Sequence, residues 1–227
     1  MKLAIVIPTY QRKDNTTPDY LKRALLSIKE QTHQDYMVYL IGDCYEDDAE
    51  FKDLATSIID SDKMTYINLP NAVEREKYPI GDKRLWTSGG ANACNFGVDL
   101  AISDGYTYIC HLDHDDWWGP DHLALINEKT NENHVIIATM GEHFNGIALP
   151  KNGTNPFYPK SSNLIHSTTC INFKETELKY RDVYAEEGRV YASDADLWDR
   201  LSSYMVKNNK SGYLVEKITC FHEKERH

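Results

Sequence analysis

The chain has 227 residues, 41% hydrophobic and 26% charged, which is enough to bury the core of one compact domain. Its formal net charge of −10 argues against sequence-independent binding to nucleic acid or an anionic membrane, since both depend on Lys and Arg. Its five cysteines are scattered, no apolar stretch is long enough to span a membrane, and LAIVIP (3–8) is too short for a secretory signal. We therefore expect reduced thiols in a cytoplasmic protein without a transmembrane segment.

The first two thirds of the chain alternate short apolar runs with amphipathic segments. The runs predict strands at 3–7, 36–42, 64–69, 106–112 and 134–140, and the amphipathic segments predict helices at 16–31, 46–60, 89–103 and 120–131. Between them, residues 70–88 have no clear period and carry most of the local basic charge. We expect a long loop there, and long loops in compact domains are often functional.

The alternation weakens beyond residue 141. Residues 141–163 are rich in Gly, Pro and Asn and are predicted to form a loop. A strand at 164–173, a helix at 194–208 and a strand at 212–221 follow. The whole pattern predicts an α/β fold with an open, mostly parallel sheet flanked by helices and a small irregular region in its second half. Ligands bind at the carboxyl ends of the strands in such sheets.

An acidic cluster, HLDHDDWW (111–118), follows the predicted strand at 106–112. Neighbouring carboxylates repel each other, and a divalent cation is an obvious compensating charge. Because residues two apart in an extended chain point to the same side, Asp113 and Asp115 form the preferred ligand pair. The shifted frame, His114 with Asp116, stays open. The ordinary alternative is a solvated turn in which Asp116 caps the following helix.

Five stretches of the chain resemble the family 2 glycosyltransferases of the GT-A fold. They are AIVIPTYQR (4–12), Gly42–Asp43, GGANACNFG (89–97), HLDHDDWW (111–118) and SDADLWDRL (193–201). Each motif is weak alone, but together they cover nearly the whole chain in the family's order. The resemblance implies a single GT-A catalytic domain over 1–227, with a nucleotide-sugar-binding half at 1–118 and an acceptor-side half at 119–227.

The resemblance also implies an activity: metal-dependent, inverting transfer of a sugar from a nucleoside-diphosphate sugar, with a UDP-sugar expected, to a carbohydrate or other hydroxyl acceptor. The implied nucleotide-sugar-binding residues are Pro8, Thr9, Tyr10, Arg12, Asp43, Arg84, Asp113, His114 and Asp115. Tyr10 would offer an aromatic surface to the base, and Asp43 would accept the N–H of uracil. Their ordinary alternatives are a packed aromatic side chain and a turn or helix cap.

The two arginines in this set are candidates for the diphosphate, because a planar guanidinium suits phosphate oxygens. A solvated surface charge is the ordinary alternative for both and the preferred one for Arg12. The family frequently has Arg where this chain has Cys94, which leaves Arg84 as a substitute.

The resemblance further implies a metal site and a catalytic base. Mn²⁺ or Mg²⁺ would be held by Asp113, Asp115 and His222, a donor set suited to Mn²⁺. The catalytic base would be Asp194, although Ser193 stands where the family usually has Glu. Asp196 is the second candidate, and the ordinary alternative for Asp194 is a helix N-cap.

Other functions fit the sequence less well. A sugar-1-phosphate nucleotidyltransferase would need a Gly-rich phosphate loop after the first strand, and IPTYQRKDN (7–15) has none. A non-catalytic carbohydrate-binding relative would not need Asp113, Asp115, Asp194 and His222 together, and a structural protein with an acidic turn would not explain the ordered motifs. The acceptor side is expected at 141–170, with candidate sugar-stacking surfaces at Trp117, Trp118 and Trp198.

Overall fold

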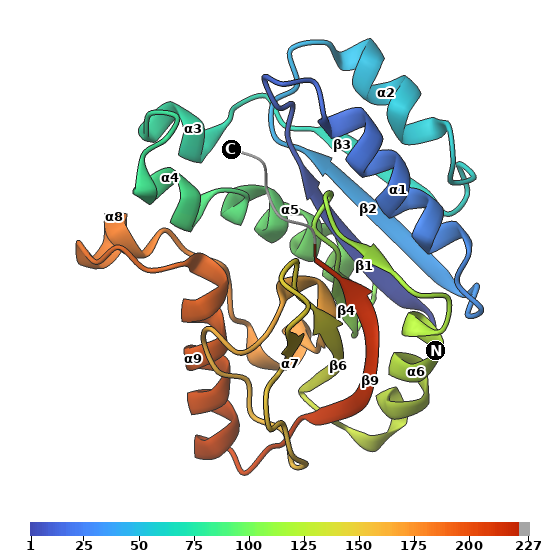
Figure 1. The fold of residues 1–227 in the computed structure, drawn as a ribbon, viewed down its shortest axis with the longest axis vertical. Helices are drawn as coiled ribbons and strands as arrows, with labels where there is room; N and C mark the ends of the chain where they lie inside the picture. The colour runs from blue at the N-terminus through green and yellow to red at the C-terminus, as the bar shows by residue number, and fades with distance from the viewer. Residues whose placement is uncertain (223–227) are drawn as a thin grey trace.

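The computed structural model describes residues 1–222, whose strands form one sheet with helices packed against both faces (Figure 1). The strands are β1 (Leu3–Thr9), β2 (Tyr36–Gly42), β3 (Met64–Asn68), β4 (Ile109–His111), β5 (Trp117–Trp118), β6 (Ile136–Glu142), β7 (Ala148–Leu149), β8 (Thr169–Ile171) and β9 (Tyr213–Phe221). The helices are α1 (Thr17–Lys29), α2 (Asp48–Thr56), α3 (Val73–Lys77), α4 (Lys83–Ser88), α5 (Ala91–Ser103), α6 (His122–Lys129), α7 (Phe173–Thr176), α8 (Val183–Glu187) and α9 (Ser193–Lys207). Two short 3₁₀ turns, η1 (Thr130–Glu132) and η2 (His166–Thr168), complete the described chain.

The sheet runs in the order β3-β2-β1-β4-β8-β6-β9-β5, with β7 paired to β6. The pairs β3–β2, β2–β1 and β1–β4 are parallel, as expected of strands joined by helical crossovers. Beyond β4 the sheet is mixed, because β8 enters antiparallel between β4 and β6, whereas β6 and β9 are parallel. The α/β sheet flanked by helices is therefore confirmed, with its irregularity in the second half as predicted.

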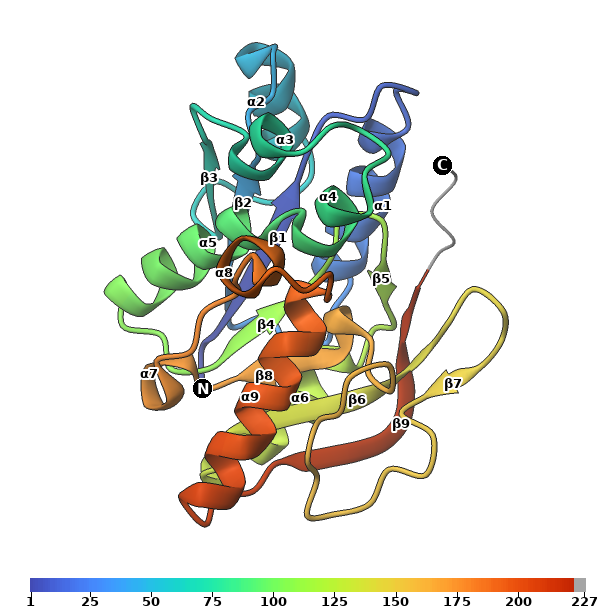
Figure 2. The same ribbon diagram turned by 90° about the vertical axis from the view of Figure 1, so that its left-hand side faces the viewer.

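The core lies on both faces of the sheet, which explains the continuous apolar runs of β1 and β2. Successive strand residues point to opposite faces, so Leu3, Ile5 and Ile7 pack toward α1 and α2, whereas Ala4 and Val6 pack toward α5. All five side chains are fully buried. Figures 1 and 2 show α1 and α5 on opposite sides of β1.

The predicted loop at 70–88 is wrong in part, because the structure has the short helices α3 and α4 there. They bury too little apolar surface to give a helical period. Local and tertiary bonds hold them instead: Asp82 accepts a bond from the main-chain N–H of Arg84, and Lys77 and Tyr78 both bond to Asp182. Of the strand predicted at 164–173, only β8 is a strand, and the three residues before it form the 3₁₀ turn η2.

All five cysteines are free thiols, and four of them are buried. None of the helices in residues 1–222 has the length and apolar character needed to cross a membrane.

A buried histidine beneath the sheet should make stability depend on pH. His122 is fully buried, stacks on Trp118 with ring centroids 4.1 Å apart, and places Nδ1 2.8 Å from the Thr219 hydroxyl. Burial lowers the pKa of His122 to about 3. The pKa of this side chain in the unfolded chain is 6.5. Below that pH, His122 binds a proton in the unfolded chain but stays neutral in the folded protein, so acid favours unfolding.

We predict that His122→Asn, which keeps a hydrogen-bonding side chain, removes this contribution. In urea unfolding between pH 6.5 and pH 4, the free energy of unfolding of the wild type should fall more steeply than that of the variant, by about 1.4 kcal/mol per pH unit. Parallel pH profiles for the two proteins would show that His122 does not titrate in this way.

Candidate active site

The carboxyl ends of β1, β2 and β4 bring the three predicted segments to one edge of the sheet. Thr9 pairs in register with Gly42, and the N–H of Asp43 donates to the carbonyl of Thr9 at 2.7 Å. The N–H of Leu112, just before the acidic cluster, donates to the carbonyl of Val6 at 3.1 Å. The parallel register of these strands therefore sets the arrangement of the site.

Asp43 is buried beside an arginine that the sequence analysis did not select. One Asp43 carboxylate oxygen lies 3.3 Å from Arg75 Nη2, which also donates to the Asp43 main-chain carbonyl. The other oxygen, Oδ1, is buried and has no hydrogen-bond partner among residues 1–222. Burial raises the pKa of Asp43, and Arg75 opposes that rise. Arg75 lies in the basic segment 70–88, but no periodicity distinguished it from its neighbours.

Tyr10 lies among cationic and imidazole side chains at the same edge. Its ring centroid is 5.5 Å from the Arg75 guanidinium and 6.0 Å from that of Arg12, and His114 meets it edge to face at 5.3 Å. The Nε2 atom of His114 is buried, and no residue from 1 to 222 forms a hydrogen bond with it. Thr9 is buried, and its hydroxyl bonds to the Tyr45 hydroxyl at 2.8 Å.

The two predicted arginines have different environments. Arg12 is only 7% exposed and places Nη1 3.7 Å from an Asp115 carboxylate oxygen, so the preferred interpretation as a solvated charge is wrong. Arg84 forms hydrogen bonds with Asp82, the N-cap residue of α4. Its guanidinium lies 5.1 Å from the ring centroids of Tyr78 and Tyr184. Arg75, not Arg84, is the arginine that contacts Asp43.

Each carboxylate of the acidic cluster has its own compensating partner. Asp113 accepts a 2.8 Å bond from His166 Nδ1, and Asp115 lies near Arg12. The third carboxylate, Asp116, accepts a 2.6 Å bond from the Ser167 hydroxyl and lies 2.9 Å from His222 Nδ1. The alternative in which Asp116 caps the next helix is therefore wrong: Asp121 occupies the N-cap position of α6, and Asp116 points inward.

These contacts shift the pKa values of the carboxylates in the cluster in different directions. Burial would raise the pKa of Asp113, but His166, His222 and His114 outweigh it and lower that pKa to about 2. Burial raises the pKa of Asp116 to about 6, against the opposing effect of His222. Despite burial, the bond to Asp116 raises the pKa of His222 to about 9. The 2.9 Å contact between Asp116 and His222 thus favours the charged form of each side chain.

The predicted metal ligands have suitable chemistry but are not gathered into a preformed cage. Within residues 1–222, no group of three or more His, Cys, Asp or Glu side chains is arranged to hold a metal ion. The donor types of Asp113, Asp115 and His222 still fit Mn²⁺, and the two carboxylates contribute to the raised pKa of His222. A cation bound there would add to the positive charge that Arg12 places beside Asp115.

Asp194 lies in the first turn of α9, and the N-cap alternative for it is wrong. The N-cap residue is Ala192, and the Asp194 carboxylate accepts a 2.7 Å bond from the Ala195 N–H. Burial raises the pKa of Asp194, and His166 is the main opposing influence. The second candidate base, Asp196, is held by three bonds of 2.6 to 2.7 Å from Arg181 and Arg200, as in a structural ion-pair network.

Two of the three candidate stacking tryptophans belong to the core. Trp198 is 1% exposed and Trp118 is 3% exposed, with the indole N–H of Trp118 donating to the Ser167 carbonyl at 2.7 Å. A role for these two in sugar stacking is therefore wrong. Trp117 is half-buried, stacks on Phe221 with centroids 5.5 Å apart, and has the Arg23 guanidinium 4.1 Å from its ring centroid.

Comparison with known proteins decides the family. No family model matches the chain. It is 35% identical over 239 residues to an uncharacterized glycosyltransferase, R139, of Acanthamoeba polyphaga mimivirus, an alignment that covers 99% of this chain and 95% of the relative. The chain belongs to the family 2 glycosyltransferases. This family 2 glycosyltransferase is also 34% identical over 124 residues, 54% of its length, to the succinoglycan biosynthesis protein ExoW of Rhizobium meliloti, of which the alignment covers 32%.

Solved structures confirm the GT-A fold of this family 2 glycosyltransferase. TarS of S. aureus in complex with UDP-GlcNAc superposes with a TM-score of 0.69 at 14% identity, covering 100% of this chain and 60% of the TarS chain. The mannosyltransferase PcManGT of Pyrobaculum calidifontis, in complex with GDP-Man and Mn²⁺, gives a TM-score of 0.63 at 11% identity. This alignment covers 99% of our glycosyltransferase and 57% of PcManGT, so the chain spans about three fifths of each solved neighbour.

Proposed function

We propose that this glycosyltransferase uses a UDP-sugar and a divalent metal ion, transfers the sugar to a hydroxyl acceptor with inversion, and takes the acceptor proton on Asp194. The main support is the convergence at one sheet edge of Asp43, the acidic cluster 113–116 and the half-buried Asp194 carboxylate on α9. Structures of the same fold hold nucleotide sugars, and one of them also holds Mn²⁺.

Asp43 carries the proposed preference for uracil. Its buried Oδ1 has no hydrogen-bond partner in the described part of the chain, and leaving a buried acceptor unpaired costs free energy. The N3–H of uracil is a donor that would satisfy it. The neighbouring ring of Tyr10 and guanidinium of Arg75 offer flat surfaces to a base. Pro8 and Thr9 are the last two residues of β1, where they would line the floor of this uracil subsite.

The leaving diphosphate needs positive charge. Asp113, Asp115 and His222 would hold Mn²⁺ or Mg²⁺, which supplies Lewis-acid stabilisation of the departing phosphate oxygens. Arg12 lies beside Asp115 and is a second cation for the phosphates. The buried Nε2 of His114, which has no hydrogen-bond partner among the described residues, would be a further contact for the nucleotide sugar. Arg84 would reach the donor only by leaving Asp82, which makes it the weakest member of the proposed set.

Asp194 is the proposed base because its environment favours taking a proton. Burial raises its pKa, so the ionised carboxylate is a stronger base than an exposed aspartate. The acceptor hydroxyl gives its proton to Asp194 while its oxygen attacks the anomeric carbon. The bond from that carbon to the diphosphate oxygen breaks in the same step, and one displacement inverts the configuration. Residues 1–118 thus form the donor half of the proposed domain and residues 119–227 the acceptor half.

The preference for UDP is tested with Asp43→Asn. We expect this variant to bind UDP at least about 10-fold more weakly than wild type, because a charge-assisted hydrogen bond becomes a neutral one. GDP binding should be weak in both proteins. Competition calorimetry in the presence of Mn²⁺ measures both affinities, with Asp53→Asn, an exposed position on α2, as the matched control. Equal UDP affinity in wild type and Asp43→Asn would contradict the role of Asp43.

A further inference from the structure

A chain of hydrogen bonds runs from the partly buried Asp113 of the acidic cluster into the core. His166, on η2, donates from Nδ1 to Asp113 at 2.8 Å, and its Nε2 lies 2.7 Å from the Tyr180 hydroxyl. That hydroxyl lies 3.2 Å from Nε2 of His111, which is fully buried. An ionised carboxylate only accepts hydrogen bonds, so the contact with Asp113 requires the proton on Nδ1 of His166. We call Asp113, His166, Tyr180 and His111 the His166 network.

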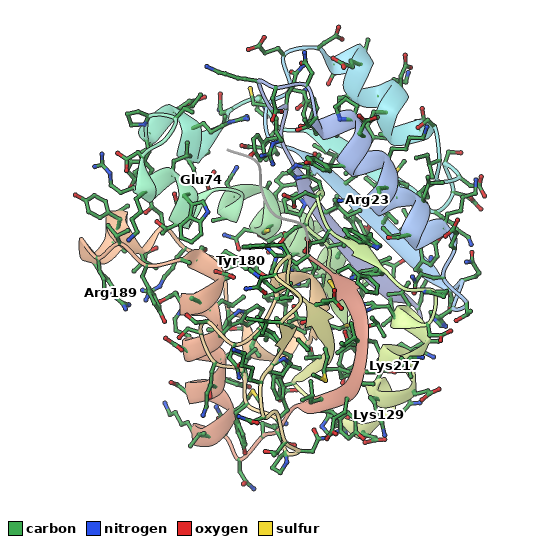
Figure 3. All side chains as sticks on the ribbon, in the orientation of Figure 1. Arg23, Glu74, Lys129, Tyr180, Arg189 and Lys217 are labelled. Carbon is green, nitrogen blue, oxygen red and sulfur yellow. The ribbon has the colours of Figure 1, made fainter. Side chains whose placement is uncertain are left out.

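The far end of the network is fixed by the scaffold. Tyr180 is 4% exposed, and its main-chain N–H and carbonyl pair with the side chain of Asn95 at 2.9 and 2.7 Å. The rings of His111 and His166 pack with centroids 4.7 Å apart, and Phe173 meets His111 at 5.4 Å. Figure 3 shows Tyr180 near the middle of the molecule, away from its outer rim. The imidazole of His166 is thus held at both nitrogens and by packing around its ring.

The same imidazole lies against the helix that carries the proposed base. The ring centroids of His166 and Trp198 are 6.2 Å apart. Trp198 follows Asp194 by four residues, so both side chains lie on one face of α9. His166 therefore stands between Asp113 on the donor side and the face of α9 that presents Asp194.

The next residue reinforces this arrangement. The Ser167 hydroxyl donates to Asp116 at 2.6 Å and accepts the N–H of Asp113 at 2.9 Å. Two successive residues of η2 therefore bond to the acidic cluster. The 3₁₀ turn at this position, which replaces part of the predicted strand, points both side chains toward the cluster.

We propose that His166 is a positioning residue, which holds the Asp113 carboxylate in its donor-binding orientation and fixes its spacing from Asp194 on α9. This inference rests on the proposed function and adds a residue to it. His166 contacts no reacting atom, and both of its nitrogens are engaged within the protein. Its contribution is to reduce the reorganisation needed when the donor and metal bind, as the partners of metal-ligating side chains do.

The test compares His166→Leu, His166→Asn and Tyr180→Phe in the full chain. The asparagine amide nitrogen stands close to the position of Nδ1 and can donate to Asp113, whereas leucine cannot. The measurements are calorimetric affinity for UDP with Mn²⁺ and turnover of the UDP-sugar. We expect His166→Leu to weaken metal-dependent UDP binding by about 10- to 100-fold, His166→Asn to recover most of that loss, and Tyr180→Phe to fall between wild type and leucine.

Controls separate positioning from folding. Thermal unfolding of each variant checks the fold, and His33→Leu, at a partly exposed position whose imidazole bonds to the Asp35 carbonyl, is the matched control. In the metal-free protein, the ¹⁵N spectrum of the histidine rings should show the His166 proton on Nδ1, which is a readout independent of turnover. If wild type binds UDP with Mn²⁺ and His166→Leu binds it equally well, or His166→Asn is as weak as leucine, the inference fails alone. If wild type itself binds no nucleotide, the proposed function fails and the inference falls with it.

Discussion

Replacing Asp194 with Asn should nearly abolish sugar transfer while leaving donor binding unchanged. The asparagine oxygen can still accept the Ala195 N–H, so the start of α9 should be preserved. The amide cannot take a proton, and removing a general base typically reduces kcat by about 10²- to 10⁴-fold. Steady-state kinetics with a saturating UDP-sugar measure kcat, and calorimetry with UDP and Mn²⁺ measures the affinity.

The matched control is Asp199→Asn on the same helix. Asp199 bonds to the Tyr191 hydroxyl at an exposed position, so its replacement should leave kcat near the wild-type value. The pH profile gives a second check: because the pKa of Asp194 is raised above the ordinary 3.8, activity should be lost as pH falls through that raised value. An Asp194→Asn variant with more than a third of wild-type kcat would mean that another group takes the proton.

Replacing Asp115 with Ala should remove metal-dependent nucleotide binding. Asp115 is buried and lies beside Arg12, and among residues 1–222 no histidine donates a hydrogen bond to its carboxylate. Its loss removes a ligand to the cation that would neutralise the diphosphate. We expect UDP affinity in Mn²⁺ to fall at least about 100-fold, since metal stabilisation of phosphate charge is worth several kcal/mol.

The same titrations in EDTA isolate the metal contribution. Without metal, wild type and Asp115→Ala should bind UDP with similar, weak affinity. The control is Asp121→Ala, at a half-exposed position six residues along the chain, where Asp121 pairs with Lys217. If Asp115→Ala kept the full Mn²⁺-dependent increase in affinity, the cation would lie elsewhere, and the shifted ligand pair His114 with Asp116 would be the next to test.

The sequence predicted the parts of this fold that periodic burial creates. The apolar runs of β1 and β2 and the face of α1 are visible in the sequence because each buries a repeating set of side chains. Helices α3 and α4 were missed because hydrogen bonds, not a buried apolar face, hold them. Asp82 caps the start of α4, and Asp182, more than a hundred residues along the chain, bonds to Lys77 at the end of α3. Tertiary bonds of this kind leave no periodic signal.

The site residues also divide into those that the sequence predicted and those that it did not. Asp43 and the acidic cluster could be placed because strand ends in a parallel sheet share one edge. Arg75 and His166 could not, since each acts through a partner more than thirty residues away. Arg75 lies in a segment without a clear period, and His166 lies in a predicted strand of which this part forms the 3₁₀ turn η2. Asp116 was predicted as an alternative cap, but its bonds to Ser167 and His222 depend on the return of two later segments to the cluster.

The most direct test of the account is a calorimetric titration of the wild-type protein with UDP, in Mn²⁺ and in EDTA, with GDP titrated in parallel. We predict that UDP binds in Mn²⁺, that EDTA weakens the binding by at least about 100-fold, and that GDP binds more weakly than UDP under both conditions. UDP binding of equal strength with and without metal would contradict the metal-dependent mechanism. Preferential binding of GDP would contradict the assignment of Asp43 to uracil.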